Sequence, residues 1–227
     1  MDSRICDMLG LEFPLVAFSH CRDVVVEVSK AGGFGVFGAA TITPEQLEIE
    51  LSWIDEHIDG KPYGVDLILP NKYEGKGEQK SPDEVLAMLP VEHIDFVNGI
   101  LEAHGVSSDD VDDAARRDSM GFANNLSIEG ALGHLDVAFA HPIKLIANAL
   151  GVPPKEMLAR GRQNGVAVAA LGGAKSHALN QVQAGVDILV VAGGEAGGHC
   201  GGVSTMVLVP EIHEAIQAVG DTPILAA

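Results

Sequence analysis

Aromatic side chains, positive charge and cysteine are all scarce in this chain of 227 residues. Aromatic residues supply 4% of the sequence, and 14 lysines and arginines stand against 32 aspartates and glutamates, which leaves a formal net charge of −18. Phosphate backbones and anionic lipid surfaces repel a chain of this charge. We therefore expect neither nucleic acid nor a membrane among its partners.

The cysteines, Cys6, Cys21 and Cys200, are odd in number, widely spaced and without a C-x-x-C pair. This pattern argues against a disulfide framework and is typical of a reducing cytosol. No apolar run reaches the ~18 residues of a membrane helix, and the first residues lack the basic-then-apolar order of a signal peptide. We expect a soluble, cytoplasmic protein.

Hydrophobic residues make up 47% of the chain, enough for one sizeable core, and glycine is abundant with 27 residues. Short β-branched runs alternate with amphipathic stretches, as in parallel β/α units. The predicted strands are 13–19, 35–40, 63–70, 143–151, 166–173, 186–191 and 223–227. The predicted helices include 22–31, 43–58, 153–164, 176–184 and 209–219.

About seven such units fit an α/β fold of the (β/α)8 TIM-barrel type, incomplete, with its last part missing. An open, doubly wound sheet is the alternative. Residues 1–227 are expected to form one partial barrel domain, with a helical excursion at about 81–130. Residues 71–83 form a long polar loop, either a lid or a disordered insertion. Residues 135–140 are an apolar patch without an assigned element.

The most informative stretch follows the sixth strand. Six glycines within 193–202 surround one acid, one histidine and one thiol, namely Glu195, His199 and Cys200. Glycine removes side-chain bulk and permits positive φ, so a flat ligand can approach the backbone closely. This pattern predicts a cofactor and a proton-transfer group in one place; a loop that merely turns the chain is the alternative.

In a barrel, the carboxyl ends of the strands form one active-site mouth. His199 is the best candidate for a general base there, because imidazole titrates near neutral pH; a structural histidine bonded to a carbonyl is the alternative. Glu195 could orient His199, bind a cofactor or simply be a loop acid. Asp66 could bond a cofactor ring nitrogen or cap its strand. The strand ends and the turns after them carry these polar groups: His20, Cys21, Asp66, Asn148, Lys175, Glu195 and His199.

Two other chemistries are disfavoured. No ligand spacing supports a metal site built from His20, Cys21, His199 and Cys200. Successive side chains usually diverge, which argues against Cys200 as a nucleophile beside His199.

Four motifs occur in order along the chain: Ala31-Gly32-Gly33-Phe34-Gly35, Gly64-Val65-Asp66-Leu67, Ala184-Gly185-Val186-Asp187 and Glu195-Ala196-Gly197-Gly198-His199. Together they resemble the nitronate monooxygenase (2-nitropropane dioxygenase-like) family, and the likeness runs from about Ile5 to the last residue. The resemblance implies an FMN-dependent (β/α)8 barrel that oxidises alkyl nitronates with O2, giving a carbonyl compound and nitrite. A nitronate and O2 are therefore the expected small-molecule partners.

The resemblance also implies His199 as the catalytic residue. Asp66 stands where the family often has an asparagine that contacts FMN, and Ala192 stands where many members have a glutamine. The flavin is expected to lie against Gly197 and Gly198. The full set of expected cofactor-binding residues is Asp66, Asn148, Lys175, Ala192, Gly193, Gly197 and Gly198, and no metal is expected.

Members of the family continue past the seventh strand into a glycine turn and an eighth strand, which cradle the FMN phosphate. The sequence here ends at Ala227, so we expect a C-terminally truncated chain that exposes the edges of its first and seventh strands. Another FMN barrel, such as an NAD(P)H-dependent enoyl or quinone reductase, and a non-catalytic remnant are the alternatives. A homo-oligomer is left open.

Overall fold

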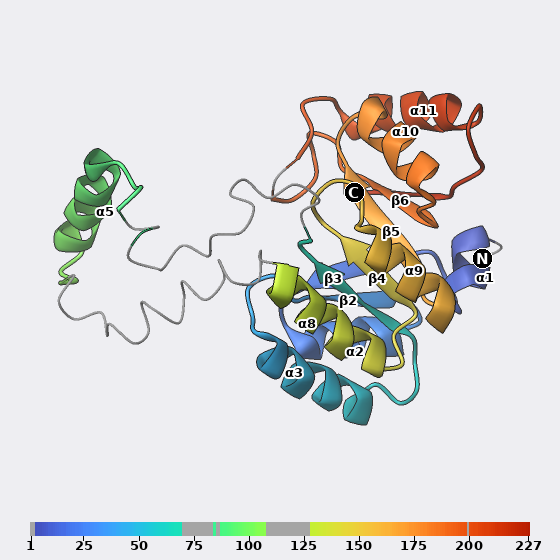
Figure 1. The fold of residues 1–227 in the computed structure, drawn as a ribbon, viewed down its shortest axis with the longest axis horizontal. Helices are drawn as coiled ribbons and strands as arrows, with labels where there is room; N and C mark the ends of the chain where they lie inside the picture. Colours follow the sequence, from blue (N-terminus) through green and yellow to red (C-terminus); the bar gives the residue numbers. More distant parts are fainter. Residues whose placement is uncertain (1–2, 70–83, 85–86, 108–127, 199) are drawn as a thin grey trace.

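Seven parallel strands form one curled sheet in this protein, of which we describe a computed structural model (Figure 1). The structure describes residues 3–69, 84, 87–107, 128–198 and 200–227. The strands are β1 (Val16–Ser19), β2 (Phe34–Gly38), β3 (Tyr63–Leu67), β4 (Leu145–Asn148), β5 (Ala167–Gly172), β6 (Ile188–Val191) and β7 (Ile224–Ala226). They lie side by side in chain order, β1 to β7.

Helices lie between the strands in chain order, and most of them cover the outer face of the sheet (Figure 1). The helix Arg4–Leu9 instead packs against the inner apolar cluster, and the helix Val91–Ala103 buries none of its residues. They are α1 (Arg4–Leu9), α2 (Arg22–Lys30), α3 (Pro44–His57), α5 (Val91–Ala103), α8 (Ile128–Ala140), α9 (Lys155–Asn164), α10 (Lys175–Ala184) and α11 (Thr205–Ile216). Among the described residues, no helix combines the length and the apolar character that crossing a bilayer requires.

The strand order decides between the two predicted architectures. A doubly wound sheet reverses its strand order at a switch point, whereas these strands follow one another from β1 to β7 without reversal. The predicted barrel-type fold is therefore confirmed, and the open doubly wound sheet is wrong. In the described part of the chain, β1 pairs with β2 only and β7 with β6 only, so the sheet is a half-barrel that stays open between its first and last strands.

Predicted strand limits agree with the structure to within three residues, but two helix predictions need correction. The apolar patch 135–140 belongs to α8, which continues past the predicted end of the helical excursion at 130. The helix predicted over 209–219 begins earlier, at Thr205, and holds Pro210 inside it. The first amide of this helix, that of Thr205, donates to the carboxylate of Glu195, ten residues earlier in the chain. The proline within the helix cannot indicate this contact, so the predicted start is too late. The predicted loop 71–83 lies outside the described residues.

Two apolar layers hold the sheet. The inner layer fills the half-barrel with side chains from several strands, and Ile5 and Leu9 of α1 pack into its floor. The outer layer lies between the sheet and the helices and includes Val25 of α2, Leu51 of α3 and Val65 of β3. Adjacent residues of one strand thus enter different layers, because side chains alternate across a sheet.

The approach of α2 to β2 is close enough to require glycine. A Cβ at Gly35 would lie 2.3 Å from the carbonyl oxygen of Val25 and 2.7 Å from its Cα. Backbone atoms cannot move aside as a flexible side chain can, so this position fixes how closely the helix lies on the sheet.

We predict that Gly35→Ala lowers the free energy of unfolding by about 1–3 kcal/mol, because the added methyl group overpacks the contact between α2 and β2. Chemical denaturation with a circular-dichroism readout measures the change. Gly99→Ala is the matched control: Gly99 is within α5, and a Cβ there meets no described atom outside the helix's own backbone within 4 Å. Alanine should therefore leave stability unchanged or raise it by up to about 1 kcal/mol. Equal stability of Gly35→Ala and the wild type would contradict the close approach.

Candidate active site

Strand register determines which side chains enter the half-barrel near the carboxyl ends of the strands. Paired residues of parallel neighbours lie on the same face of a sheet. Asp66 of β3 pairs with Ala147 of β4, which belongs to the inner apolar cluster. Ala192 comes two residues after Val190, which packs against the same cluster. Asp66 and Ala192 therefore both face the interior, as the predicted cofactor site requires.

The Asp66 carboxyl group is buried without a described partner. Asp66 is 7% exposed, and its Oδ1 atom has no hydrogen-bond partner in the described part of the chain. Burial raises the pKa of Asp66 to about 7, because an apolar environment disfavours the charged form. This carboxyl group can therefore gain or lose a proton near neutral pH, unlike an ordinary aspartate.

His20 lies beside Gly38, the residue of β2 that pairs with Asp66. Gly38 of β2 pairs with Asp66, and a Cβ at Gly38 would lie 2.8 Å from Nδ1 of His20. The His20 Nδ1–H donates a hydrogen bond to the Gly38 carbonyl over 2.8 Å. Cys21 instead directs its thiol toward Asp23, at 3.6 Å, at the start of α2. Of these two predicted mouth residues, His20 is the one that contacts the strand next to β3.

Two predicted cofactor residues are engaged elsewhere. The Asn148 side chain is fully buried; its Oδ1 accepts from the Leu69 amide over 2.9 Å, and its Nδ2 donates to the Leu150 carbonyl over 2.8 Å. It thereby joins the chain segments that follow β3 and β4. Lys175 is the first residue of α10, and its Nζ forms a 2.9 Å ion pair with Glu211 of α11 on the helical layer.

The glycine loop after β6 is folded against the start of α11. A Cβ at Gly193 would lie 2.2–2.5 Å from atoms of Thr205, and one at Gly201 would lie 2.8 Å from the Gly173 carbonyl oxygen. At Gly197 and Gly198, by contrast, an added Cβ would meet no atom of the described residues within 4 Å, apart from the adjoining residues of the chain. The ends of the loop are thus tightly packed while its centre leaves open space above the backbone.

Glu195 fastens this loop to α11. Its Oε2 accepts a hydrogen bond from the Thr205 amide over 2.7 Å, and its Oε1 accepts from the Ser204 hydroxyl group. The Ser204 hydroxyl and the Thr205 amide hold the pKa of Glu195 at about 2, so the carboxylate is charged at the positive end of the α11 dipole. Sequence reasoning considered Glu195 as a partner of His199 or of a cofactor and missed this capping role.

His199 itself lies outside the described residues. Its neighbours on the loop are described: Gly198 has a positive φ of 71°, and Cys200 is a free, exposed thiol.

A second missed residue is Gln181 of α10, which is buried and donates from Nε2 to the Leu171 carbonyl over 2.7 Å. A glutamine on the apolar side of a predicted helix was the available signal.

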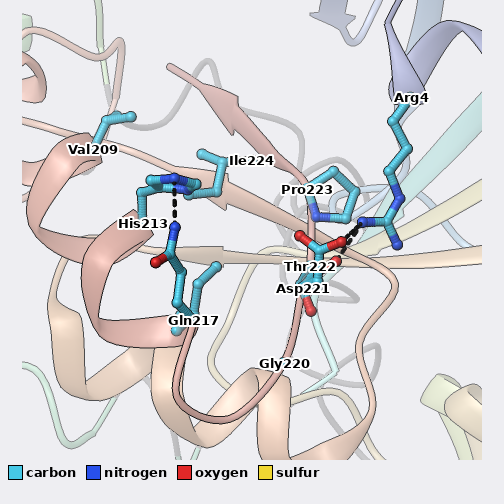
Figure 2. A pocket seen from close by; sticks show the side chains of 10 residues that line it. Arg4, Val209, His213, Gln217, Gly220, Asp221, Thr222, Pro223 and Ile224 are labelled. Carbon is cyan, nitrogen blue, oxygen red and sulfur yellow. Dashed lines mark hydrogen bonds and ion pairs between the residues drawn. The ribbon is translucent and has the colours of Figure 1, made fainter.

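A hollow of about 300 Å³ is present elsewhere, beside β7 (Figure 2). Arg4, His213 and Thr222 are among its lining residues. It lies at the amino end of β7, because Thr222 and Pro223 precede that strand, whereas the candidate site lies at the carboxyl ends. Arg4 is paired with Asp221 over 2.8 Å. This hollow therefore offers no unpaired charge comparable to the Asp66 carboxyl group.

Solved structures define the class of the fold. The nitroalkane oxidase of Streptomyces ansochromogenes matches 99% of this chain and 60% of its own, with a TM-score of 0.68 at 23% identity. FabK of Thermotoga maritima matches 100% of this chain and 54% of its own, with a TM-score of 0.65 at 20% identity. At these identities the likeness establishes the fold alone: a barrel-type α/β protein.

The sequence profile described as nitronate monooxygenase matches residues 16–227, so the chain belongs to the nitronate monooxygenase family. The resemblance stated from the sequence is thereby confirmed. A Mycobacterium tuberculosis protein described as "Putative monooxygenase Rv1533" is 50% identical over the whole of this chain. A "Probable nitronate monooxygenase" of Staphylococcus saprophyticus is 24% identical. The chain spans 59% and 61% of the lengths of these two relatives.

We predict that Asp66→Asn stabilises the protein at pH 8 by about 4 kcal/mol, since the amide has no charge to bury and each pKa unit corresponds to about 1.4 kcal/mol. Because burial raises this pKa, the wild-type protein loses stability as the pH rises from 3.8, the ordinary pKa of an aspartate, to about 7, the pKa of Asp66 in the folded protein. The gain should therefore shrink toward pH 4. Urea unfolding of both proteins at several pH values measures it; a gain that is the same at every pH would contradict the burial of this charge.

We predict that Glu195→Ala speeds hydrogen exchange at the Thr205 amide, because that amide donates to the Glu195 carboxylate. Glu195→Gln should have a smaller effect, since an amide oxygen can still accept the bond. Hydrogen–deuterium exchange resolved to peptides that contain Thr205 provides the measurement. Unchanged exchange in the alanine variant would show that the carboxylate does not hold the loop.

Proposed function

We propose that this chain forms the flavin-binding part of an enzyme that oxidises alkyl nitronates with O2 to a carbonyl compound and nitrite, with FMN as its cofactor. Membership of the nitronate monooxygenase family supports the reaction class. The observation that supports the site most is the inward-facing carboxyl group of Asp66, whose Oδ1 has no partner in the part of the chain that the structure describes. It lies at the carboxyl ends of the strands, as do the open glycines.

The described residues fit a flat ring. Gly38, Ala147 and Ala192 contribute little bulk to the inner face, and Asp66 offers an unsatisfied oxygen to a ring edge. Bound FMN would supply the ability to take a pair of electrons from the substrate and pass them to O2. We propose that Asp66, Ala192, Gly193, Gly197 and Gly198 line this cofactor.

Two further residues of the expected set would act from a distance. Asn148 would fix the shape of the β3 and β4 ends through its bonds to Leu69 and Leu150. Lys175 would hold α10 against α11 through Glu211. In this proposal neither side chain is released from those contacts to reach the flavin.

His199 would act as the general base toward neutral nitroalkanes, accepting the proton of the carbon beside the nitro group. Backbone N–H groups of the glycine loop would stabilise the anionic nitronate. This assignment rests on the place of His199 in the Glu195–His199 motif, and Glu195 would keep that loop at the carboxyl end of β6 by capping α11.

We predict that His199→Ala lowers turnover of a neutral nitroalkane by about 10²–10⁴-fold, the usual contribution of a general base, and lowers turnover of the preformed nitronate far less. The measurement is nitrite release in the presence of FMN and O2. His213→Ala is a control histidine beside the hollow of Figure 2 and should keep wild-type rates. Equal losses with both substrates would remove the assignment of His199 as a base.

The absorption spectrum and the electron donor distinguish the alternatives. A protein that is colourless once unbound FMN has been removed would be a remnant without flavin chemistry. A yellow chain that consumes NADH or NADPH without releasing nitrite would belong to the reductase alternative.

A further inference from the structure

We propose that Asp66 binds the flavin as a neutral carboxylic acid, donating a hydrogen bond to an acceptor on the ring edge, so that FMN binding requires one proton on this side chain. The identity of the ligand rests on the function proposed above. The protonation state itself rests on the surroundings of Asp66 and can be tested without the flavin.

The geometry leaves the Asp66 carboxyl group available to a ligand. It faces the interior beside Ala147, and its Oδ1 has no hydrogen-bond partner among the described residues. Two polar side chains from the neighbouring strand ends are already committed, because His20 donates to the Gly38 carbonyl and Asn148 bonds backbone groups of Leu69 and Leu150. A buried polar atom without a partner costs free energy, and a bound ligand at the mouth would satisfy it.

No described cation lies beside Asp66 to keep it ionised. The neighbouring strands place Gly38 and Ala147 next to it. His20, in the turn after β1, is the titratable group that the described residues place beside Gly38. The basic side chains of α2 are paired on the helical side of the sheet: Arg22 pairs with Glu50 over 3.3 Å, and Lys30 pairs with Asp59 over 3.1 Å. Its other charged residues, Asp23 and Glu27, are exposed acids.

Desolvation then favours the acid form. Burial raises the pKa of Asp66 to about 7, so a ligand that needs the proton loses affinity as pH rises through that value. Above it, each pH unit should weaken binding about tenfold. An ionised Asp66 that accepted a hydrogen bond from the ring would give the opposite slope.

The first test measures FMN affinity by the quenching of flavin fluorescence between pH 6 and pH 8.5. Wild-type affinity should fall about 30-fold across this range, as expected for one required proton on a group of this pKa. Asp66→Asn, which carries a permanent N–H donor, should change little. Asp221→Asn removes a fully exposed carboxylate at the amino end of β7 and should retain the wild-type slope.

Wild-type affinity that is constant or that rises with pH would overturn the proposal, as would a parallel fall in Asp66→Asn. The second test needs no flavin: the infrared difference spectrum between wild type and Asp66→Asn should contain a carboxylic-acid carbonyl band at pH 6 that disappears by pH 8.5. Absence of that band at pH 6 would overturn the neutral acid.

The two tests separate this inference from the proposed reaction. A titrating Asp66 in a chain that binds no FMN at any pH would overturn the flavin as its partner and the proposed function with it. Proton-linked FMN binding without nitrite release would support this inference and contradict the nitronate reaction alone.

Discussion

The parallel register of β2, β3 and β4 places one carboxyl group inside the half-barrel, and the candidate site depends on that placement. Gly38 and Ala147 flank Asp66 on the two neighbouring strands, so small groups surround an ionisable one. A shift of β3 by one residue would turn Asp66 toward the helices and bring Val65 or Leu67 to the inner face. The same alternation that separates the two apolar layers thus also directs the chemistry to the interior.

The glycine loop complements this buried acid from the other side of the curled sheet. Its ends are packed against α11 and β5, and the Glu195 carboxylate caps the first turn of α11. The open centre at Gly197 and Gly198 is therefore held by its two ends. The two carboxyl groups differ in their surroundings. Glu195 is exposed, hydrogen-bonded and ionised, whereas Asp66 is buried, has no hydrogen-bond partner for its Oδ1 among the described residues, and has a pKa near neutrality.

Local sequence patterns sufficed for the strands, because each is a short apolar run bounded by glycine, proline or polar residues, and their alternation with helices predicts a parallel sheet. They also made Asp66 a candidate, and the structure shows that this residue is buried within β3. They could not predict the roles of Glu195 and Asn148, because both depend on backbone groups from other segments: the α11 start for Glu195 and the ends of β3 and β4 for Asn148. The start of α11 was mispredicted for the same reason.

The most direct test of this account is a crystal structure of the chain with FMN. The account predicts that the ring lies at the carboxyl ends of the strands, with an acceptor atom within hydrogen-bond distance of the Asp66 carboxyl group and one ring face over Gly197 and Gly198. A flavin bound in the hollow between Arg4 and His213, or one that leaves the Asp66 oxygen unpaired, would contradict it.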